Sequence, residues 1–198
     1  MTTRLTSALA LTLALVATPL LANELDDFVV PEGFEARTLE PTGGRIARPV
    51  GWFYREAHDA ASFKWVLSKE DPDSGPYQTG VRIQMIFGLK QKAGKSAADF
   101  AKDFLDSKRA SSKVLSECET EDQGLLIYSC LVTEELIVSV NEEDPFQIRY
   151  GVFWGSQLDV AVFVIAGTPQ DQWPEHEAIF SEIEKFQLID LERFAHGD

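Results

Sequence analysis

The chain is poor in the residues that most often carry chemistry, with only two cysteines and three histidines among 198 residues. It contains no Cys-x-x-Cys and no His-x-x-x-His, so a zinc site has no local scaffold. It also lacks Gly-x-Ser-x-Gly, the turn that presents the nucleophile of many serine hydrolases. These absences argue against the common metalloenzymes and hydrolases, and we expect neither a cofactor nor a bound metal.

Long hydrophobic runs are scarce as well, and the one that stands out lies at the N-terminus, from Ala8 to Val16. It is shorter than the roughly 20 residues that span a bilayer. It follows Arg4 and precedes Pro19 and Ala22, which is the order of a cleavable secretory signal. The sequence therefore predicts a signal peptide over residues 1–22 and a periplasmic or secreted protein without a membrane segment after cleavage. A retained N-terminal anchor is the alternative.

Positive charge is the third scarcity. The 18 lysines and arginines are outnumbered by 32 acidic residues, for a formal net charge of −14. Such a surface repels nucleic-acid phosphates and anionic lipid headgroups, so we expect no nucleic-acid partner. It tolerates cationic partners or divalent ions, although acidity that keeps an exported protein soluble is the simpler interpretation. The composition does not identify the partner, whether a protein or a small molecule of the envelope.

The chain divides into four parts by composition. After the signal, prolines, glycines and acidic residues interrupt residues 23–44, where we expect a flexible acidic lead-in. Residues 45–190 are expected to form a single domain, since their number suits one hydrophobic core. Residues 191–198 are expected to be a C-terminal tail.

Strand patterns dominate the expected domain. Apolar and polar residues alternate over 63–68, 81–87 and 146–154, as in strands with one buried face. Residues 158–167 are apolar on both faces, which is typical of a strand near the centre of a sheet. The turn that begins at Gly155 predicts that the last two segments form a hairpin.

Two helices are expected among these strands. One begins after Ser96, a candidate N-cap with Asp99 three residues on. The other lies between Trp173 and Phe186 and begins near Pro174, which cannot lie deep inside a helix. This order does not suit a doubly wound parallel sheet. We expect an α+β fold, an α/β/α sandwich with a central antiparallel sheet and two main helices.

The two cysteines, Cys118 and Cys130, lie on strand-like segments that flank an acidic turn. Export favours a disulfide between them, whereas redox-active pairs are usually closer in sequence. A tight turn around Gly124 would place Cys118 opposite Tyr128 or Ser129. A disulfide therefore requires a bulge or a looser loop, with Cα atoms within about 7 Å of each other.

Two other residues are candidates for ligand contact. Trp52 follows Gly51 at a turn, and we expect it to be partly exposed there. His58, beside Asp59, is the histidine that lies in a loop where it could act. We expect His176 to be a solvated helix residue, because its helical neighbours are not ligands.

Two alternative functions depend on these loops. The first is a hydrolase-like enzyme in which His58 works with a nearby carboxylate. The second is a weak calcium-responsive module, because Asp71 and Asp73 resemble the opening of a calcium loop, although the closing glutamate is missing. The acidic turn from Asn141 to Phe146 is similar in kind. Ordinary turn chemistry explains both acidic segments more simply.

A series of motifs runs from Arg45 to Leu188: "RPVGWFYRE", then "FKWVLS" and "TGVRIQMIF", a helix with Ser-x-x-Asp-Phe, and "TPQDQWPEHEAIFSEIEKFQL" near the end. In its order, this series resembles the PsbP-like superfamily. The group includes photosystem extrinsic subunits, nuclear Ran-binding relatives and DcrB-like bacterial envelope proteins. It implies an α/β/α sandwich around an antiparallel sheet. Because its members are mostly non-catalytic binding or assembly proteins, the resemblance argues against an enzyme. Together with the predicted signal peptide, it leads us to expect an exported binding or assembly protein of the cell envelope.

Overall fold

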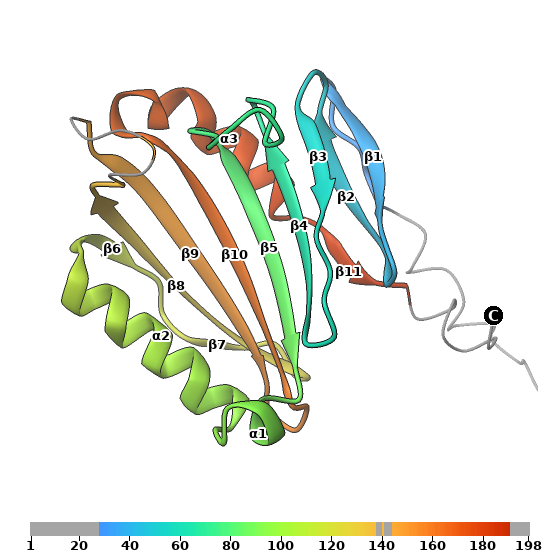
Figure 1. Ribbon diagram of the computed structural model, residues 1–198, viewed down its shortest axis with the longest axis vertical. Helices are drawn as coiled ribbons and strands as arrows, with labels where there is room; N and C mark the ends of the chain where they lie inside the picture. The colour runs from blue at the N-terminus through green and yellow to red at the C-terminus, as the bar shows by residue number, and fades with distance from the viewer. Residues whose placement is uncertain (1–27, 138–139, 141–143, 191–198) are drawn as a thin grey trace, which may run out of the picture.

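The computed structural model describes residues 28–137, 140 and 144–190. The expected signal peptide and C-terminal tail lie outside these residues. The strands and helices in chain order (Figure 1) are β1 (Phe34–Leu39), β2 (Gly43–Pro49), β3 (Phe53–Glu56), β4 (Ser62–Ser68), β5 (Gly80–Phe87), α1 (Leu89–Lys92), α2 (Ala97–Ser111), β6 (Lys113–Glu117), β7 (Glu121–Asp122), β8 (Leu126–Glu135), β9 (Phe146–Gly155), β10 (Val160–Pro169), the 3-10 turn η1 (Gln170–Gln172), α3 (Trp173–Ile183) and β11 (Gln187–Ile189).

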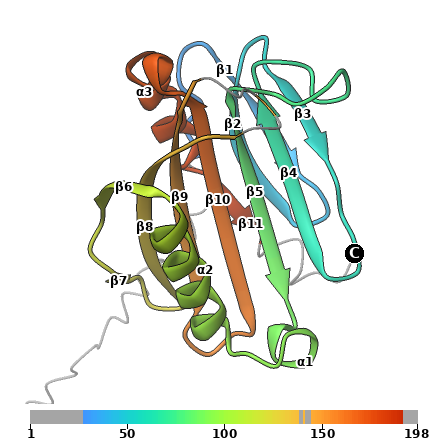
Figure 2. The ribbon, with the colours of Figure 1, turned by 60° about the vertical axis from the view of Figure 1, so that its left-hand side comes forward.

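A large antiparallel sheet forms the centre of the fold. Its strand order is β3-β4-β5-β10-β9-β8-β6, with β7 paired to β8, and a small sheet of order β1-β2-β11 lies beside it. Helix α2 packs on one face against β9 and β10, and α3 packs on the other against β10 and β2 (Figures 1 and 2). The predicted α+β sandwich with a central antiparallel sheet and two main helices is confirmed.

The predicted hairpin is also present. β9 and β10 pair antiparallel, and β10 pairs with β5 on its other side, so it lies in the middle of the sheet. Most of β10 is buried, as its apolar residues on both faces predict. Arg82 of β5 and Tyr150 of β9 both face Ile165 of β10, so this row crosses three strands on the face of α2.

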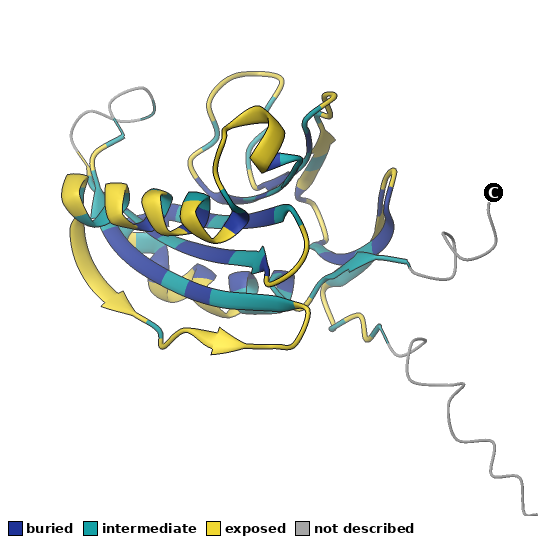
Figure 3. Cartoon of the chain, turned by 90° about the horizontal axis from the view of Figure 1, so that it is seen from below, coloured by how far each residue is buried: buried dark blue, intermediate teal, exposed yellow. Residues whose placement is uncertain are grey.

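Helix α2 begins where the capping pattern predicts. The Ser96 hydroxyl accepts a hydrogen bond from the backbone N–H of Asp99 at 3.1 Å and donates one to the Asp99 carboxylate at 2.6 Å. The helix buries Ala97, Ala101 and Leu105 against the sheet and exposes its opposite side, while β6 and β7 are exposed along their length (Figure 3).

The ordered domain begins earlier than the composition predicts. The expected lead-in, residues 23–44, contains β1 and the start of β2, which pair with each other over the whole of β1. The expectation of a flexible segment up to Gly44 is therefore wrong for this part. Its prolines do not interrupt a strand, because Pro31 precedes β1 and Pro41 lies in the turn before β2, and Gly43 and Gly44 are themselves part of β2. Leu39 at the end of β1 is fully buried in the core.

Two apolar clusters fill the spaces between the layers. The cluster beneath α3 and the small sheet is rich in aromatic residues, including Trp65, Trp173 and Phe180. The cluster beneath α2 includes Leu105, Tyr150 and other residues of β9 and β10. In the described part of the chain, no helix combines the length and the hydrophobicity that crossing a membrane requires.

Candidate functional site

The two cysteines form the predicted disulfide. Cys118 and Cys130 are joined with Cα atoms 5.2 Å apart, and the Cys118 N–H donates to the Cys130 carbonyl at 3.3 Å. Glu121 faces Tyr128 whereas Glu117 faces Leu131, so the register shifts by one residue between the turn and Cys118, as the sequence requires for a disulfide. The pair is therefore a structural link between β8 and the chain that follows the edge strand β6.

Trp52 lies in the core, and the expectation of an exposed side chain is wrong. It is only 9% exposed and packs against His176 and Phe180 of α3, with ring centroids 6.3 Å and 6.4 Å away. The expectation of a solvated His176 is wrong for the same reason, since α3 turns this side chain inward to 4% exposure. Its Nδ1 lies 3.0 Å from the Gln172 carbonyl, to which it donates.

His58 is exposed, but both of its ring nitrogens are engaged. Its Nδ1 accepts the backbone N–H of Lys64 at 3.2 Å, so the proton lies on Nε2, which donates to the Glu56 carboxylate at 3.2 Å. The nearby carboxylate that the hydrolase hypothesis requires is therefore Glu56. Among the described residues, no serine or cysteine side chain is hydrogen-bonded to His58, which leaves it without a nucleophile to activate.

The first acidic turn uses its carboxylates locally. Asp71 accepts from the Asp73 N–H at 2.9 Å and from the Ser74 hydroxyl at 3.0 Å, and Asp73 pairs with Arg55 at 2.9 Å. No group of three metal-binding side chains comes together within the part of the chain that the structure describes. Most of the second acidic turn, residues 141–143, lies outside it.

The most ligand-like feature is a cavity of about 640 Å³ on the face of α2. Its floor is formed by β5, β10 and β9, and its walls by the C-terminal part of α2, the end of β8 and the loop before β5. We call it the Arg82 hollow and define it by residues from these elements, among them Tyr77, Arg82, Phe104, Glu135, Tyr150 and Gly167. In Figure 2, α2 lies in front of the β8–β10 part of the sheet, and β5 lies beside it.

Two glycines shape the floor of the hollow. Gly80 of β5 faces Gly167 of β10 in the strand register, so neither strand contributes a side chain there. A Cβ on Gly80 would lie 2.9 Å from the ring of Tyr77, which shows that this ring packs onto the bare strand. A Cβ on Gly167 would meet Ile148 at an ordinary 3.5 Å. The hollow thus depends on glycines from two strands that are distant in sequence.

One wall carries a fully paired charge network centred on Glu135. Its carboxylate accepts from the hydroxyls of Thr133 at 2.7 Å and Tyr150 at 2.8 Å, and pairs with Lys108 of α2 at 3.0 Å. Burial acts to raise the pKa of Glu135, but these three hydrogen bonds together hold it below its usual value. Burial and the bond to Glu135 raise the pKa of Tyr150 far above its usual value. The carboxylate therefore stays charged and the phenol neutral around neutral pH.

Arg82 projects from the floor of the hollow and, unlike the residues of the Glu135 network, its side chain is unpaired among the described residues. Among the described residues, no side chain or carbonyl forms a hydrogen bond or ion pair with the Arg82 guanidinium, and its Nε is buried without a partner. Its positive charge opposes the rise in pKa that burial gives both Tyr77 and Tyr150, so it acts electrostatically on both walls. A partly buried guanidinium without an acceptor is a ready site for an anion.

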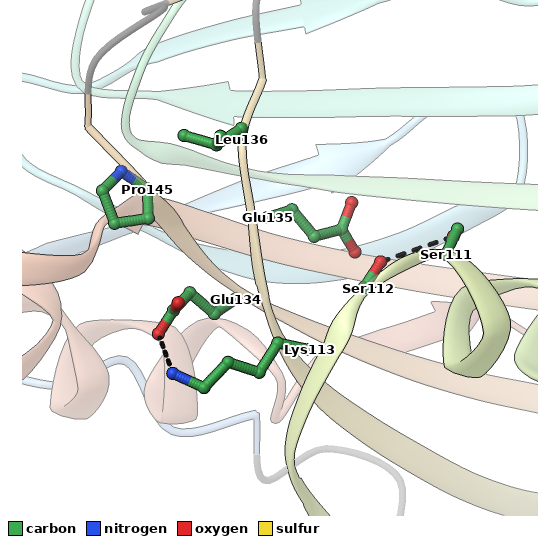
Figure 4. A pocket seen from close by; sticks show the side chains of 7 residues that line it. All are labelled: Ser111, Ser112, Lys113, Glu134, Glu135, Leu136 and Pro145. Carbon is green, nitrogen blue, oxygen red and sulfur yellow. Dashed lines mark hydrogen bonds and ion pairs between the residues drawn. The ribbon is translucent and has the colours of Figure 1, made fainter.

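A second hollow of about 540 Å³ lies on the other side of the end of β8 (Figure 4). Its lysine is already neutralised, because Lys113 pairs with Glu134 at 2.9 Å, and Gln170 donates to the same carboxylate at 3.0 Å. Glu135 and Leu136 border both hollows. Because the cation here has a partner, the Arg82 hollow is the better candidate for binding.

The chain is thus an α+β sandwich with a ligand-sized hollow at the edge of one layer. No protein-family model and no curated protein sequence matches it. Similar solved structures include cyanobacterial PsbP from Synechocystis sp. PCC 6803, with 15% identity and a TM-score of 0.47 over 80% of this chain and 94% of that one.

Two further structures are similar to the chain. The Saccharomyces cerevisiae Ran-binding protein Mog1p has 13% identity and a TM-score of 0.46, over 80% of this chain and 97% of its own. A Pseudomonas aeruginosa protein has 12% identity and a TM-score of 0.39, over 75% and 91%. At these identities and TM-scores, the matches support no statement about function.

Proposed function

We propose that the protein is an exported, non-catalytic binding protein of the cell envelope, and that its ligand occupies the Arg82 hollow. The observation that carries the proposal is the hollow itself. Its volume of about 640 Å³ lies within the range of small-molecule sites, and it combines mostly apolar walls with a few charged groups.

The chemistry of the hollow favours binding over catalysis. Its described lining residues include no histidine, cysteine or serine, so no activated nucleophile of the usual kind is available. Glu135 stays ionised, Lys108 is its ion-pair partner, and the raised pKa of Tyr150 keeps that phenol neutral. Groups fixed in one protonation state suit recognition, whereas general acid–base catalysis needs a pKa near the working pH.

Two observations support export. Residues 1–22 have the order of a cleavable signal, although they lie outside the described part of the chain. The disulfide between Cys118 and Cys130 suits an oxidising compartment. The expectation of a periplasmic or secreted location stays a prediction, to be checked by finding the processed chain outside the cytoplasm.

Native mass spectrometry of the exported protein, purified without detergent, tests the proposal. The wild type should carry a bound small molecule in a fraction of its population. Gly167→Leu should lose it, because the new side chain projects into the hollow. Gly167→Ala is the matched control and should keep it, since a Cβ at this position meets its nearest neighbour at 3.5 Å. Equal occupancy in the Leu variant, or a wild type that carries no ligand, would contradict the proposal.

A further inference from the structure

We infer that the ligand of the Arg82 hollow is a small amphipathic monocarboxylate, whose carboxylate is bound by Arg82 and whose apolar body lies against the walls. The inference rests on the proposed function and names the chemical class of its ligand.

The anchor is the unsatisfied guanidinium. The Arg82 side chain has no hydrogen-bonding partner among the described residues, and its buried Nε cannot be satisfied by bulk water. A carboxylate matches the planar fork of a guanidinium with two parallel hydrogen bonds, which a lysine cannot offer. The hollow therefore has a recognition group in place and lacks only the acceptor.

The balance of charge in the hollow limits the ligand to a single negative charge. The other nearby cation, Lys108, is already paired with Glu135 at 3.0 Å, so only Arg82 remains uncompensated. The ionised Glu135 carboxylate would repel a second anionic group, and so would the formal net charge of −14. A phosphate monoester or a dicarboxylate suits this site less well than a monocarboxylate.

The walls call for an apolar body. Phe104, Phe146, Ile148 and Ile165 line the hollow, and the Tyr150 hydroxyl is engaged with Glu135. At its border, Leu136 is 62% exposed and extends the apolar surface outward. A purely polar anion would leave these surfaces in water, so burying an alkyl or aryl body adds favourable free energy that such an anion cannot supply.

Isothermal titration of the purified exported protein tests the inference with three probes. Decanoate combines the charge with an apolar body, decanol has the body alone, and acetate has the charge alone. We expect decanoate to bind about tenfold or more tightly than decanol, and acetate to give no measurable binding, because a charge-assisted bidentate contact is worth about that factor.

Variants separate the role of Arg82 from general electrostatics. Arg82→Gln should weaken decanoate binding about tenfold or more and leave decanol binding unchanged, and Arg82→Lys should lie between the two. Arg55→Gln is the matched control, because Arg55 lies in the same row across the sheet but is paired with Asp73, at 2.9 Å, outside the hollow. It should bind decanoate like the wild type, and circular dichroism checks that each variant is folded.

The outcomes distinguish the inference from the proposal on which it rests. If decanol binds as tightly as decanoate and Arg82→Gln changes neither, the hollow binds apolar molecules and the carboxylate inference is wrong. If Arg55→Gln weakens binding as much as Arg82→Gln does, the effect is one of net charge and the anchor is wrong. If no probe binds the wild type, the inference also fails, and native mass spectrometry of Gly167→Leu alone then decides the proposed function.

Discussion

The two faces of the central sheet lie in different environments, although the side chains of each strand alternate between them. One face is covered by α3 and the small sheet, and Trp65, Phe180 and Ile183 there are fully buried. The other is covered by α2, which packs on β9 and β10 and leaves β5 at the edge of its cover. The closed face is a buried core, and the partly covered face holds the Arg82 hollow. The extent of cover therefore decides which face can accept a ligand.

The same contrast appears in two carboxylates. Burial raises the pKa of Glu184 on the α3 side, and Arg149, 2.9 Å away, offsets part of the rise. Burial acts on Glu135 as well, but three hydrogen bonds hold the pKa of that carboxylate below its usual value. On the closed face, burial destabilises the ionised form of Glu184. At the wall of the hollow, hydrogen bonds stabilise the ionised form of Glu135.

The largest expected effect comes from truncating the closed face. Phe180→Ala should lower the free energy of unfolding by about 3–5 kcal/mol, because the fully buried ring contacts Trp173 and its removal leaves a cavity. Phe104→Ala, at the partly exposed wall of the hollow, should lower it by only about 1–2 kcal/mol. Urea denaturation of both variants measures the difference. Equal losses would mean that the two faces are equally closed.

Removing the disulfide should give the next largest effect. Replacing Cys118 and Cys130 by serine should lower the free energy of unfolding by about 2–3 kcal/mol, since the link closes a short loop, with a sequence separation of 12. Wild type under reducing conditions should match the variant. Hydrogen exchange should show lost protection in β6 and β8 while the strands beneath α3 keep theirs. A loss centred on β2 and α3 would contradict this assignment.

The two carboxylates should titrate on opposite sides of their shared usual pKa of 4.5. The stabilisation from Glu135 is complete above this value and is lost as the pH falls through its lowered folded pKa. Glu184 has the opposite sign, because the folded protein holds its proton more tightly, so stability falls as the pH rises through its raised folded pKa. Carbon-13 NMR of the carboxyl groups measures both midpoints. A reversed order would refute the contrast.

The smallest expected effect is at the N-terminal end of α2. Ser96→Ala should lower the free energy of unfolding by about 1 kcal/mol, because the cap of one helix is lost. Ligand binding in the hollow should not change, since the hollow lies near the other end of α2. Thermal denaturation and titration with decanoate check both points, and a large change in affinity would show that the cap and the hollow are coupled.

The sequence predicted those features that depend on residues close to one another along the chain. The Ser96 cap, the hairpin of β9 and β10, and a disulfide that requires a bulge are each fixed by spacing within one segment. Trp52 and His176 were misjudged because α3 buries both, and the packing of α3 cannot be read from their neighbours in sequence. The start of the domain was misplaced because Pro31 and Pro41 lie outside β1 and β2 and interrupt neither strand.

The Arg82 hollow was not predicted for the same reason. Arg82 lies on the polar side of an alternating strand, a pattern typical of a solvent-facing residue. Gly80 and Gly167 come from different parts of the chain and face each other only once β5 and β10 pair. A weak signal was nevertheless present, because a glycine inside a strand, such as Gly167, often marks a place that a ligand or another backbone approaches closely.

The most direct test of this account follows side-chain NMR signals while decanoate is added to the exported protein. The Arg82 Nε–H signal should shift in a saturable way, because this guanidinium lies in the open hollow. The Trp65 indole N–H, which donates to the Glu40 carbonyl at 2.8 Å in the closed core, should not move. A saturable shift of the Trp65 signal with no change at Arg82 would contradict the central claim that the partly covered face is the binding face.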